Sequence, residues 1–367
     1  MSNSRFAIFD DKLANFQLLE TEIPSLSEGE ILVKISYTTI CRSDIYTYQR
    51  VRKEKTPTIL GHEIVGKIVK FGEGANKIDL RGHTLELGNR ITWGIYAGDP
   101  NSYYSQKGIP QKSEGLFKYG HEQLTDKSTL HGGLADYIIL RPHTPIIKLL
   151  DFIPDPIAAL INCSVATVAG GFRLANKIKD QNILINGTGM LGSIACAMAS
   201  KGHAKNVIAV DTNHERVKNA ITFGANIAVS YNDDPLKIKE QINEFAGEDL
   251  KIDVVIEFSG LPSAMLSTLN LLDIGGTAVW IGATFPQDSV PINGEIIVRK
   301  LLTIKGLHNY NEKDLISAVA FMESCYELFD FQSMIHGGFK LEDVNKAFEY
   351  AVNKNPFRVG IDLSIEQ

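Results

Sequence analysis

The part of the chain between residues 182 and 283 alternates short apolar runs with helical stretches, and this alternation limits the fold more than any other feature. The runs NILIN, NVIAVD and IDVVIEFSG have the length and composition of buried strands. The stretches SIACAMASKGHA and HERVKNAITFGA, which lie between them, have the pattern of helices. Strands that alternate with helices at this spacing predict βαβ units and a parallel sheet.

The first of these strands leads into a glycine-rich turn, in which Gly187, Gly189 and Gly192 form a GxGxxG pattern. The pattern alone is weak, but here a strand precedes it, a helix opens from it and the next strand ends at Asp211. Such glycines allow a pyrophosphate to sit on the helix N-terminus. Asp211 would accept hydrogen bonds from the ribose hydroxyls and repel a 2′-phosphate, so the pattern predicts NAD. The alternative is a glycine turn that binds no ligand.

The chain has 367 residues, which is more than the roughly 250–300 that one core accommodates, so we expect two domains. The N-terminal third has short strand-like runs separated by Gly, Pro and Asn. Residues 99–127 are polar and without periodicity, which predicts a long loop or lobe. Residues 311–367 contain two amphipathic helical stretches and the closing strand RVGIDL.

Composition excludes several classes of function. With 44% hydrophobic and 22% charged residues the chain has the composition of a soluble globular protein, and a net charge of −6 argues against nucleic acid or an anionic membrane as a partner. The N-terminus lacks a signal-peptide pattern, and we see no run of about 18 apolar residues. Four scattered cysteines favour a reducing cytoplasm over a disulfide framework.

Three of the residues before the nucleotide-binding pattern are candidate metal ligands: Cys41, His62, which Glu63 follows, and Cys163. Two thiolates and one imidazole leave a fourth position open, as in a catalytic zinc site. Spacing alone does not show that they meet, and a free cysteine is more often a small buried hydrophobe.

The segments around these residues resemble the medium-chain zinc-dependent alcohol dehydrogenase family. The resemblance lies in CRSD at 41–44, GHEIVGKIVKFGEGA at 61–75 and INCSVATVAG at 161–170, and it extends over essentially the whole chain. It implies an α/β protein with a GroES-like β-barrel catalytic domain and a Rossmann domain built on a doubly wound parallel sheet. The implied boundaries are 1–164 for the catalytic domain, 165–300 for the NAD-binding domain and 301–367 for a C-terminal segment that returns to the catalytic domain.

By position, the resemblance implies that Cys41, His62 and Cys163 bind one catalytic zinc ion and that Glu63 lies beside the metal. It implies an enzyme that transfers a hydride between an alcohol, or its aldehyde or ketone, and NAD. Zinc lowers the pKa of the alcohol, while the cofactor carries the hydride chemistry.

The remaining residues carried over by position serve proton transfer and the cofactor. Ser43 matches the hydroxyl that takes the substrate proton, and Asp44 the carboxylate that holds the zinc-bound imidazole. Arg42 and Arg358 match family positions that contact the cofactor pyrophosphate, and Arg216 matches a position near the adenosine.

The sequence departs from the family in the lobe. Many members hold a structural zinc there with four cysteines, but the same spacing falls here on Asp99, Ser102, Ser105 and Ser113. Hydroxyls are poor zinc ligands, so we expect the structural zinc to be absent. The residues expected to hold the lobe by aromatic packing are Trp93, Tyr103, Tyr104 and Phe117.

A second departure is Tyr46, which stands where many members have a histidine that passes the proton to solvent. The relay then ends on water or on another group such as His308.

INCSVATVAGGFRLAN and SEGLFKYGH resemble a subgroup associated with phosphonate catabolism, which implies an anionic hydroxyalkyl phosphonate or phosphate bound by Lys112 and Lys118. A polyol, sugar or amino-cyclitol alcohol stays open, as does the physiological direction.

Three alternatives to this function are a zinc-free NADPH quinone or enone reductase of the same fold, a non-catalytic NAD-binding protein and a short-chain-type tyrosine dehydrogenase. The candidate ligands Cys41, His62 and Cys163, together with Asp211, oppose the first. The absence of the lobe cysteines is the only support for a non-catalytic NAD-binding protein. A short-chain-type tyrosine dehydrogenase is opposed because this chain places no Tyr-x3-Lys motif after the nucleotide-binding domain. We expect a homodimer or homotetramer.

Overall fold

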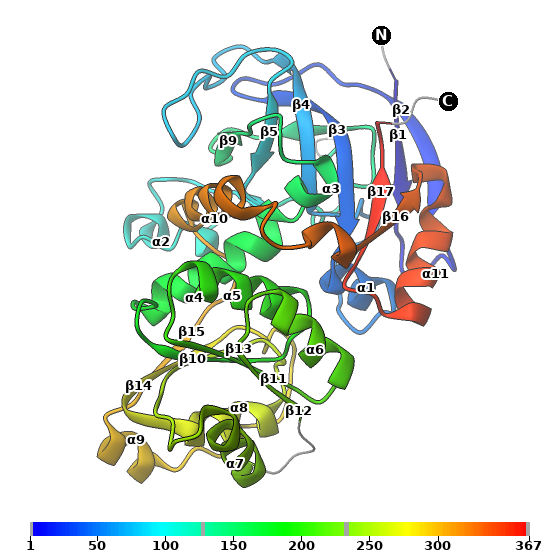
Figure 1. The fold of residues 1–367 in the computed structure, drawn as a ribbon. Helices are drawn as coiled ribbons and strands as arrows, with labels where there is room; N and C mark the ends of the chain where they lie inside the picture. The colour runs from blue at the N-terminus through cyan, green and yellow to red at the C-terminus, as the bar shows by residue number, and fades with distance from the viewer. Residues whose placement is uncertain (1–2, 126–128, 231–234, 365–367) are drawn as a thin grey trace. The chain divides into compact units, whose positions relative to one another are not determined.

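A computed structural model describes residues 3–125, 129–230 and 235–364, so the end of the predicted lobe, residues 126 and 127, lies outside the described residues. The chain divides into two compact units (Figure 1). Unit 1 comprises Met1–Ala166, Asn311–Tyr326 and Phe331–Gln367; unit 2 comprises Thr167–Tyr310 and Glu327–Asp330.

Unit 2 contains a six-stranded sheet in the order β12-β11-β10-β13-β14-β15, in which all paired strands are parallel. The register aligns Asn186 with Val210 and with Glu257, so β10, β11 and β13 end together at one edge. The strands are β10 (Asn182–Asn186), β11 (Asn206–Asp211), β12 (Ile227–Ser230), β13 (Ile252–Glu257), β14 (Leu272–Trp280) and β15 (Thr303–Gly306).

Helices connect these strands, because parallel neighbours need a crossover. The connecting helices are α5 (Met190–Lys201), α6 (His214–Thr222), α7 (Pro235–Ala246), α8 (Pro262–Leu271) and α9 (Gly294–Lys300), and α4 (Ala166–Ala175), which begins at the unit boundary, precedes β10. Unit 2 continues to Tyr310 rather than ending at residue 300, because β15 pairs with β14 and extends the sheet.

Unit 1 is built around a mainly antiparallel sheet in the order β16-β17-β3-β4-β5-β9, and β8 also pairs with β3. The C-terminal β17 lies against β3, with Thr39 opposite Gly360, which places the end of the chain in this unit. The strands of unit 1 are β1 (Asn3–Ile8), β2 (Gln17–Glu22), β3 (Ile31–Ile40), β4 (Glu63–Phe71), β5 (Arg90–Trp93), β6 (Tyr96–Ala97), β7 (Phe117–Lys118), β8 (Tyr137–Leu140), β9 (Ile146–Lys148), β16 (Ile335–Phe339) and β17 (Arg358–Asp362).

Helices and short helical turns join the strands of unit 1. The α-helices are α1 (Arg42–Tyr48), α2 (Tyr103–Gln106), α3 (Asp155–Ala158), α10 (Glu312–Cys325) and α11 (Val344–Lys354). The other turns are the π-helical η2 (Ile161–Val165) and the 3-10 turns η1 (Pro110–Lys112), η3 (Phe331–Met334) and η4 (Leu341–Asp343).

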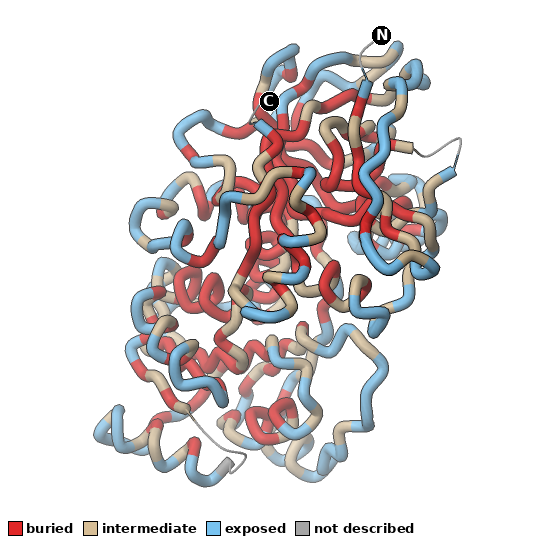
Figure 2. The backbone as a smooth tube through the Cα atoms, turned by 90° about the vertical axis from the view of Figure 1, so that its right-hand side faces the viewer, coloured by how far each residue is buried: buried red, intermediate tan, exposed pale blue. Residues whose placement is uncertain are grey.

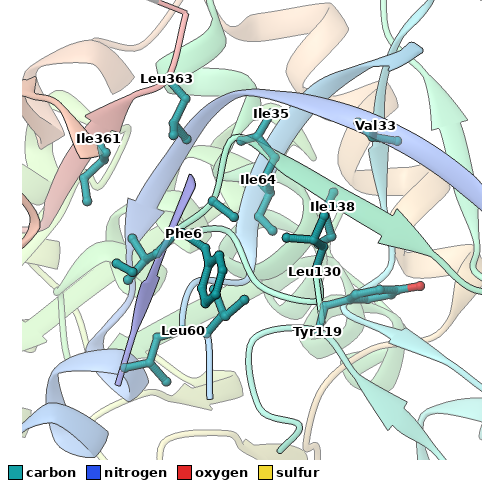
Figure 3. Packing of buried hydrophobic residues seen from close by; sticks show 14 of the residues in the cluster. Phe6, Val33, Ile35, Leu60, Ile64, Tyr119, Leu130, Ile138, Ile361 and Leu363 are labelled. Atoms are coloured by element: carbon teal, nitrogen blue, oxygen red, sulfur yellow. The ribbon is translucent and has the colours of Figure 1, made fainter. Parts of the chain in front are cut away.

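The hydrophobic core of unit 1 contains side chains from its sheet strands and from the N-terminal segment. Figure 3 labels Phe6, Leu60 and Ile64 among them. Buried residues follow β3 and the first half of β4. In Figure 2 the red stretches of the tube mark the buried parts of the chain. β3 is buried along nearly its whole length and β4 over its first half, so the core contacts both strands where they pair.

One helical stretch, Asp155–Ala175, has a mean hydropathy of 1.5 and is long enough to cross a membrane. Of its most apolar window, 83% is buried inside the protein. The sequence shows no continuous apolar run there, because Asn162 and Ser164 interrupt it. This burial is that of a core helix.

Candidate metal centre

The pairing of β3 with β4 brings two of the candidate ligands to the same end of the sheet. Thr39 lies opposite Glu63, so Cys41, just after β3, and His62, just before β4, are neighbours. Cys163 comes from the π-helical turn η2, a type of turn that is frequent at functional sites. The ligand atoms of Cys41, His62 and Cys163 all lie within 4.8 Å of one another.

These three side chains fit a zinc ion because two thiols and an imidazole converge at one place, where Cys41 and His62 are buried and Cys163 is partly buried. The hydrogen bond from the Cys163 thiol holds the pKa of Cys41 well below its usual value, against the effect of burial and with help from Arg358. The same bond, together with burial, raises the pKa of Cys163. Although burial acts in the opposite direction, Asp44 raises the pKa of His62. A divalent cation replaces such shared protons and is therefore suited to this site.

Asp44 connects the two chain segments that carry Cys41 and His62. Its Oδ2 accepts a hydrogen bond from the Cys41 backbone N–H at 2.9 Å and caps α1, and its Oδ1 lies 3.3 Å from His62 Nδ1. The same Oδ1 accepts the Gly61 N–H at 3.4 Å. The carboxylate thereby leaves His62 Nε2 as the nitrogen available to a metal.

Glu63 forms a buried ion pair with Arg358, the first residue of β17. The Arg358 Nε and Nη2 donate to the two carboxylate oxygens at 2.7 and 2.9 Å. Thr39 and Ser164 donate their hydroxyls to the same carboxylate at 2.6 and 2.7 Å. Burial raises the pKa of Glu63, and the Arg358 charge opposes that rise.

The remaining predicted residues of unit 1 lie around this centre. The Ser43 Oγ is 3.4 Å from His62 Nε2. Arg42 hydrogen-bonds to Asn355 and lies 6.0 Å from the centre of the Tyr46 ring. Arg358, for which a contact with the cofactor pyrophosphate stays a prediction, is 4% exposed and forms an ion pair with Glu63.

In unit 2 the glycine turn has the close packing that its sequence predicts. Gly187 has φ +84°, and a Cβ there would lie 2.8 Å from the Ser259 backbone nitrogen. A Cβ at Gly192 would lie 2.0 Å from the Gly187 oxygen, so both positions require glycine. At Gly189 a Cβ would meet only Arg216 Nη1, at 3.9 Å, which puts that guanidinium beside the turn.

Asp211 ends β11 beside the glycine turn and is 9% exposed. Its carboxylate accepts the Thr188 N–H at 2.7 Å and the Asn213 N–H at 2.8 Å. The residue thus supports the turn in addition to the role predicted for it at the ribose.

Sequence reasoning missed several residues of the site. Thr39 and Ser164 donate to Glu63, and the adjacency of Ser164 to Cys163 was the available signal. His121 was not singled out, yet its ring centre lies 4.9 Å from that of His62. Glu257, buried at the end of β13, accepts the Ser259 and Gly260 N–H groups and so shapes the loop that packs on Gly187.

In the lobe, hydroxyl groups connect the residues that stand at the positions of the family's structural-zinc ligands. Ser113 Oγ and Ser105 Oγ each form a hydrogen bond of 2.9 Å with Ser102 Oγ, and Ser105 also donates to the Asp99 carbonyl at 2.7 Å. The predicted aromatic cluster is wrong. Trp93 and Phe117 belong to the buried core, whereas Tyr103 and Tyr104 are exposed.

Comparison with known proteins agrees with this combination of a zinc-type donor set and a parallel nucleotide-binding sheet. Residues 27–151 match the model of the alcohol dehydrogenase GroES-like domain, and residues 191–324 match that of the zinc-binding dehydrogenases. The chain is 29% identical over 300 residues to L-threonine 3-dehydrogenase of Thermococcus kodakarensis, which covers 79% of this chain and 78% of that protein. It is 25% identical over 359 residues to L-threonine 3-dehydrogenase of Pseudoalteromonas translucida. That match covers 93% of this chain and 91% of that protein.

Solved structures share the fold over nearly the whole chain. An alcohol dehydrogenase from Thermotoga maritima superposes with a TM-score of 0.91 at 24% identity, covering 99% of this chain and 100% of that one. Galactitol-1-phosphate dehydrogenase from Escherichia coli superposes with a TM-score of 0.83 at 20% identity, and the match covers 98% of this chain and 99% of that one.

The fold and the donor set together define a zinc- and nicotinamide-dependent dehydrogenase. The chain belongs to the zinc-dependent medium-chain dehydrogenase family. It is accordingly an NAD-linked oxidoreductase of the alcohol dehydrogenase type, and the zinc-free reductase alternative is not favoured.

Proposed function

We propose that this chain transfers a hydride between an alcohol and NAD at a single zinc centre formed by Cys41, His62 and Cys163. The observation that carries the proposal is the convergence of the three ligand atoms within 4.8 Å. When bound, zinc lowers the pKa of the substrate hydroxyl, and NAD supplies the hydride acceptor. The protein positions the reactants and moves the proton.

Each neighbouring residue has a distinct role in this proposal. Asp44 fixes the orientation of the His62 ring, and Ser43, whose Oγ lies 3.4 Å from His62 Nε2, accepts the proton of the substrate hydroxyl. Glu63 places a carboxylate beside the ligands, where Arg358 balances its charge. Arg42 serves the cofactor pyrophosphate.

The cofactor-binding residues of unit 2 are the three glycines of the turn with Asp211 and Arg216. The position of Asp211 at the end of β11 supports NAD as the preferred cofactor, because a carboxylate there accepts the ribose hydroxyls and repels a 2′-phosphate. Arg216, next to Gly189, is available to the adenosine side.

We also propose a homodimer or homotetramer. The edge strand β15 is partly exposed, and Val298 of α9 and Leu301, which precede β15 in the chain, are 73% and 71% exposed. An open edge flanked by apolar side chains is a surface that a second copy can cover. Light scattering of the purified protein measures the mass; a monomer at micromolar concentration contradicts this proposal.

The cytoplasm is the proposed compartment. All four cysteines, Cys41, Cys163, Cys196 and Cys325, are free thiols in the structure, and a reducing environment preserves them. Measuring oxidation of these thiols in intact cells tests the proposal, and extensive disulfide formation there opposes it.

Metal analysis combined with NAD reduction over a panel of alcohols tests the proposed function. The panel contains L-threonine, a polyol, a sugar alcohol and a hydroxyalkyl phosphonate. We expect zinc in the protein and NADH formation with at least one alcohol class. Zinc-free protein that reduces enones with NADPH identifies the rival reductase, whereas NAD binding without turnover on any substrate identifies a non-catalytic protein.

A further inference from the structure

Asn162 lies in the π-helical turn η2, directly before the candidate ligand Cys163, and it is fully buried. Its side-chain amide contacts the backbone on both sides of Glu63. The Nδ2 group donates to the His62 carbonyl at 3.0 Å, and Oδ1 accepts the Ile64 N–H at 3.2 Å. One side chain therefore joins the turn that carries Cys163 to the segment that carries His62.

The two hydrogen bonds have the pattern that a parallel strand neighbour would make. In a parallel pair, one residue bonds to the residues before and after its counterpart on the adjacent strand. The Asn162 amide takes the place of the N–H and C=O of such a residue, because the pairing of β4 with β5 covers Gly66 and Lys67 and does not reach Ile64. The amide thus sets both the distance and the orientation of η2 relative to the start of β4.

Ser164, on the other side of Cys163, contacts the same segment in a different way. Its Oγ donates to Glu63 Oε1 at 2.7 Å and accepts from Arg358 Nη2 at 2.7 Å. Ser164 therefore holds a side chain, the Glu63 carboxylate, whereas Asn162 holds the backbone next to it. Asn162 acts on the position of the ligand-bearing segment itself.

A zinc site needs its ligand atoms at fixed separations, because Zn–S and Zn–N bonds are about 2.3 Å and 2.0–2.1 Å long. The ligand atoms of Cys41, His62 and Cys163 lie within 4.8 Å of one another, and they come from three separate chain segments. Asp44 joins the first two segments, through the Cys41 N–H and His62 Nδ1. Asn162 joins the third segment to the second, so the two residues together connect all three ligands.

We propose that Asn162 is a positioning residue of the metal centre, which holds Cys163 at the distance from His62 that a bound ion requires. The inference rests on the proposed function. It deepens that function because it adds a residue that acts through the ligand-bearing segments. Loss of the amide should leave η2 free to shift relative to β4, so the three ligands should bind the ion less tightly.

Asn162→Leu tests the proposal, because leucine has the branched shape of asparagine and lacks both polar atoms. Competition with a chromogenic chelator measures zinc affinity, which we expect to be about 10- to 100-fold weaker than in the wild type. Cobalt(II) in place of zinc gives a second readout, since its visible absorption reports ligand geometry. The spectrum of the variant should differ from that of the wild type. Asn162→Ala provides the same test if the leucine variant does not fold.

Asn182→Ala controls for the loss of any buried asparagine. Asn182 begins β10 in unit 2, where its Nδ2 donates to the Lys251 carbonyl at 2.7 Å and its Oδ1 accepts from the Asn206 side chain at 2.8 Å. This variant should lose thermal stability but keep the zinc affinity and the cobalt spectrum of the wild type. A loss of zinc affinity in Asn182→Ala as large as that in Asn162→Leu overturns the proposal.

Hydrogen–deuterium exchange of the metal-free protein separates this inference from the proposed function. The Ile64 amide should exchange more rapidly in Asn162→Leu than in the wild type, because it has lost its acceptor. If the wild type binds zinc tightly and the Asn162 variants bind it equally well, the inference fails and the proposed function stands. If the wild type binds no zinc while Ile64 exchange depends on Asn162, the proposed function fails and the positioning of the two segments stands.

Discussion

Arg358 illustrates how much one buried side chain does at the residue scale. Its Nε and Nη2 are occupied by Glu63, and Nη2 also donates to Ser164 at 2.7 Å. Its Nη1 donates to the Phe357 carbonyl at 2.8 Å. Because Nη1 carries two N–H groups, one of them is the donor that a cofactor phosphate would need. The ion pair with Glu63 therefore leaves Arg358 a donor for the pyrophosphate contact that the family resemblance implies.

Ser43→Ala should lower turnover much more than it weakens cofactor binding. The hydroxyl lies beside His62 Nε2, and its removal interrupts the proposed proton path without touching the nucleotide. We expect kcat to fall about 100-fold or more, the typical contribution of general acid–base catalysis. Steady-state kinetics with an NAD titration measures both quantities, and Ser317→Ala on the exposed face of α10 is the control. An unaltered kcat would assign Ser43 to a turn.

Asp211→Gly should relax the preference for NAD over NADP. Loss of the carboxylate removes its repulsion of a 2′-phosphate, so the ratio of the two kcat/KM values should fall by about tenfold, equivalent to roughly 1.4 kcal/mol. The variant also loses the acceptor for the Thr188 and Asn213 N–H groups, so a lower Tm is expected. Equal use of NAD and NADP by the wild type would refute the cofactor assignment.

At the scale of elements, the metal ligands could be named from the sequence, but their meeting could not be derived from spacing. Cys41 and His62 converge because Thr39 lies opposite Glu63 in the antiparallel β3–β4 pair. A long connection separates β3 from β4, so no short turn fixes this register and local sequence does not determine it. Cys163 reaches them from a π-helical turn, which its local sequence did not indicate. The expectation that these three ligands meet came from the family resemblance and not from the local sequence.

The connection between α1 and the start of β4 depends on Asp44. Asp44→Ala removes the cap of α1 and the carboxylate next to His62 Nδ1, so the ring orientation is no longer fixed. We expect zinc affinity to fall about 10- to 100-fold. Competition with a chromogenic chelator measures it, and Asp314→Ala, which removes the analogous cap of α10, controls for loss of a helix cap. Equal zinc affinity in wild type and Asp44→Ala would contradict this role.

The lobe should hold no zinc in the natural protein. Ser102, Ser105 and Ser113 hydrogen-bond to one another, and neutral hydroxyls lack the charge and softness of thiolates. We expect elemental analysis to find a zinc-to-chain ratio near one. Replacing Asp99, Ser102, Ser105 and Ser113 together by cysteine should raise the ratio to near two. A wild-type ratio near two that persists after His62→Ala would show that other ligands hold a metal in the lobe.

At the scale of the whole molecule, the sequence predicts unit 2 better than unit 1. The runs NILIN and NVIAVD coincide with β10 and β11, because a parallel sheet buried on both faces produces continuous apolar strands. The short strand β15 was missed, since Thr303–Gly306 has no such run. In unit 1 the core needs β17 from the far end of the chain, a pairing that only the family resemblance suggested.

The most direct test of the central claim is a zinc titration of metal-free protein, with NADH formation measured at saturating NAD and alcohol. The account predicts negligible activity without metal. Activity should then rise linearly and reach its plateau at one zinc per chain, and His62→Ala should stay inactive throughout. Full activity before zinc is added, or a plateau that requires two ions per chain, would contradict it.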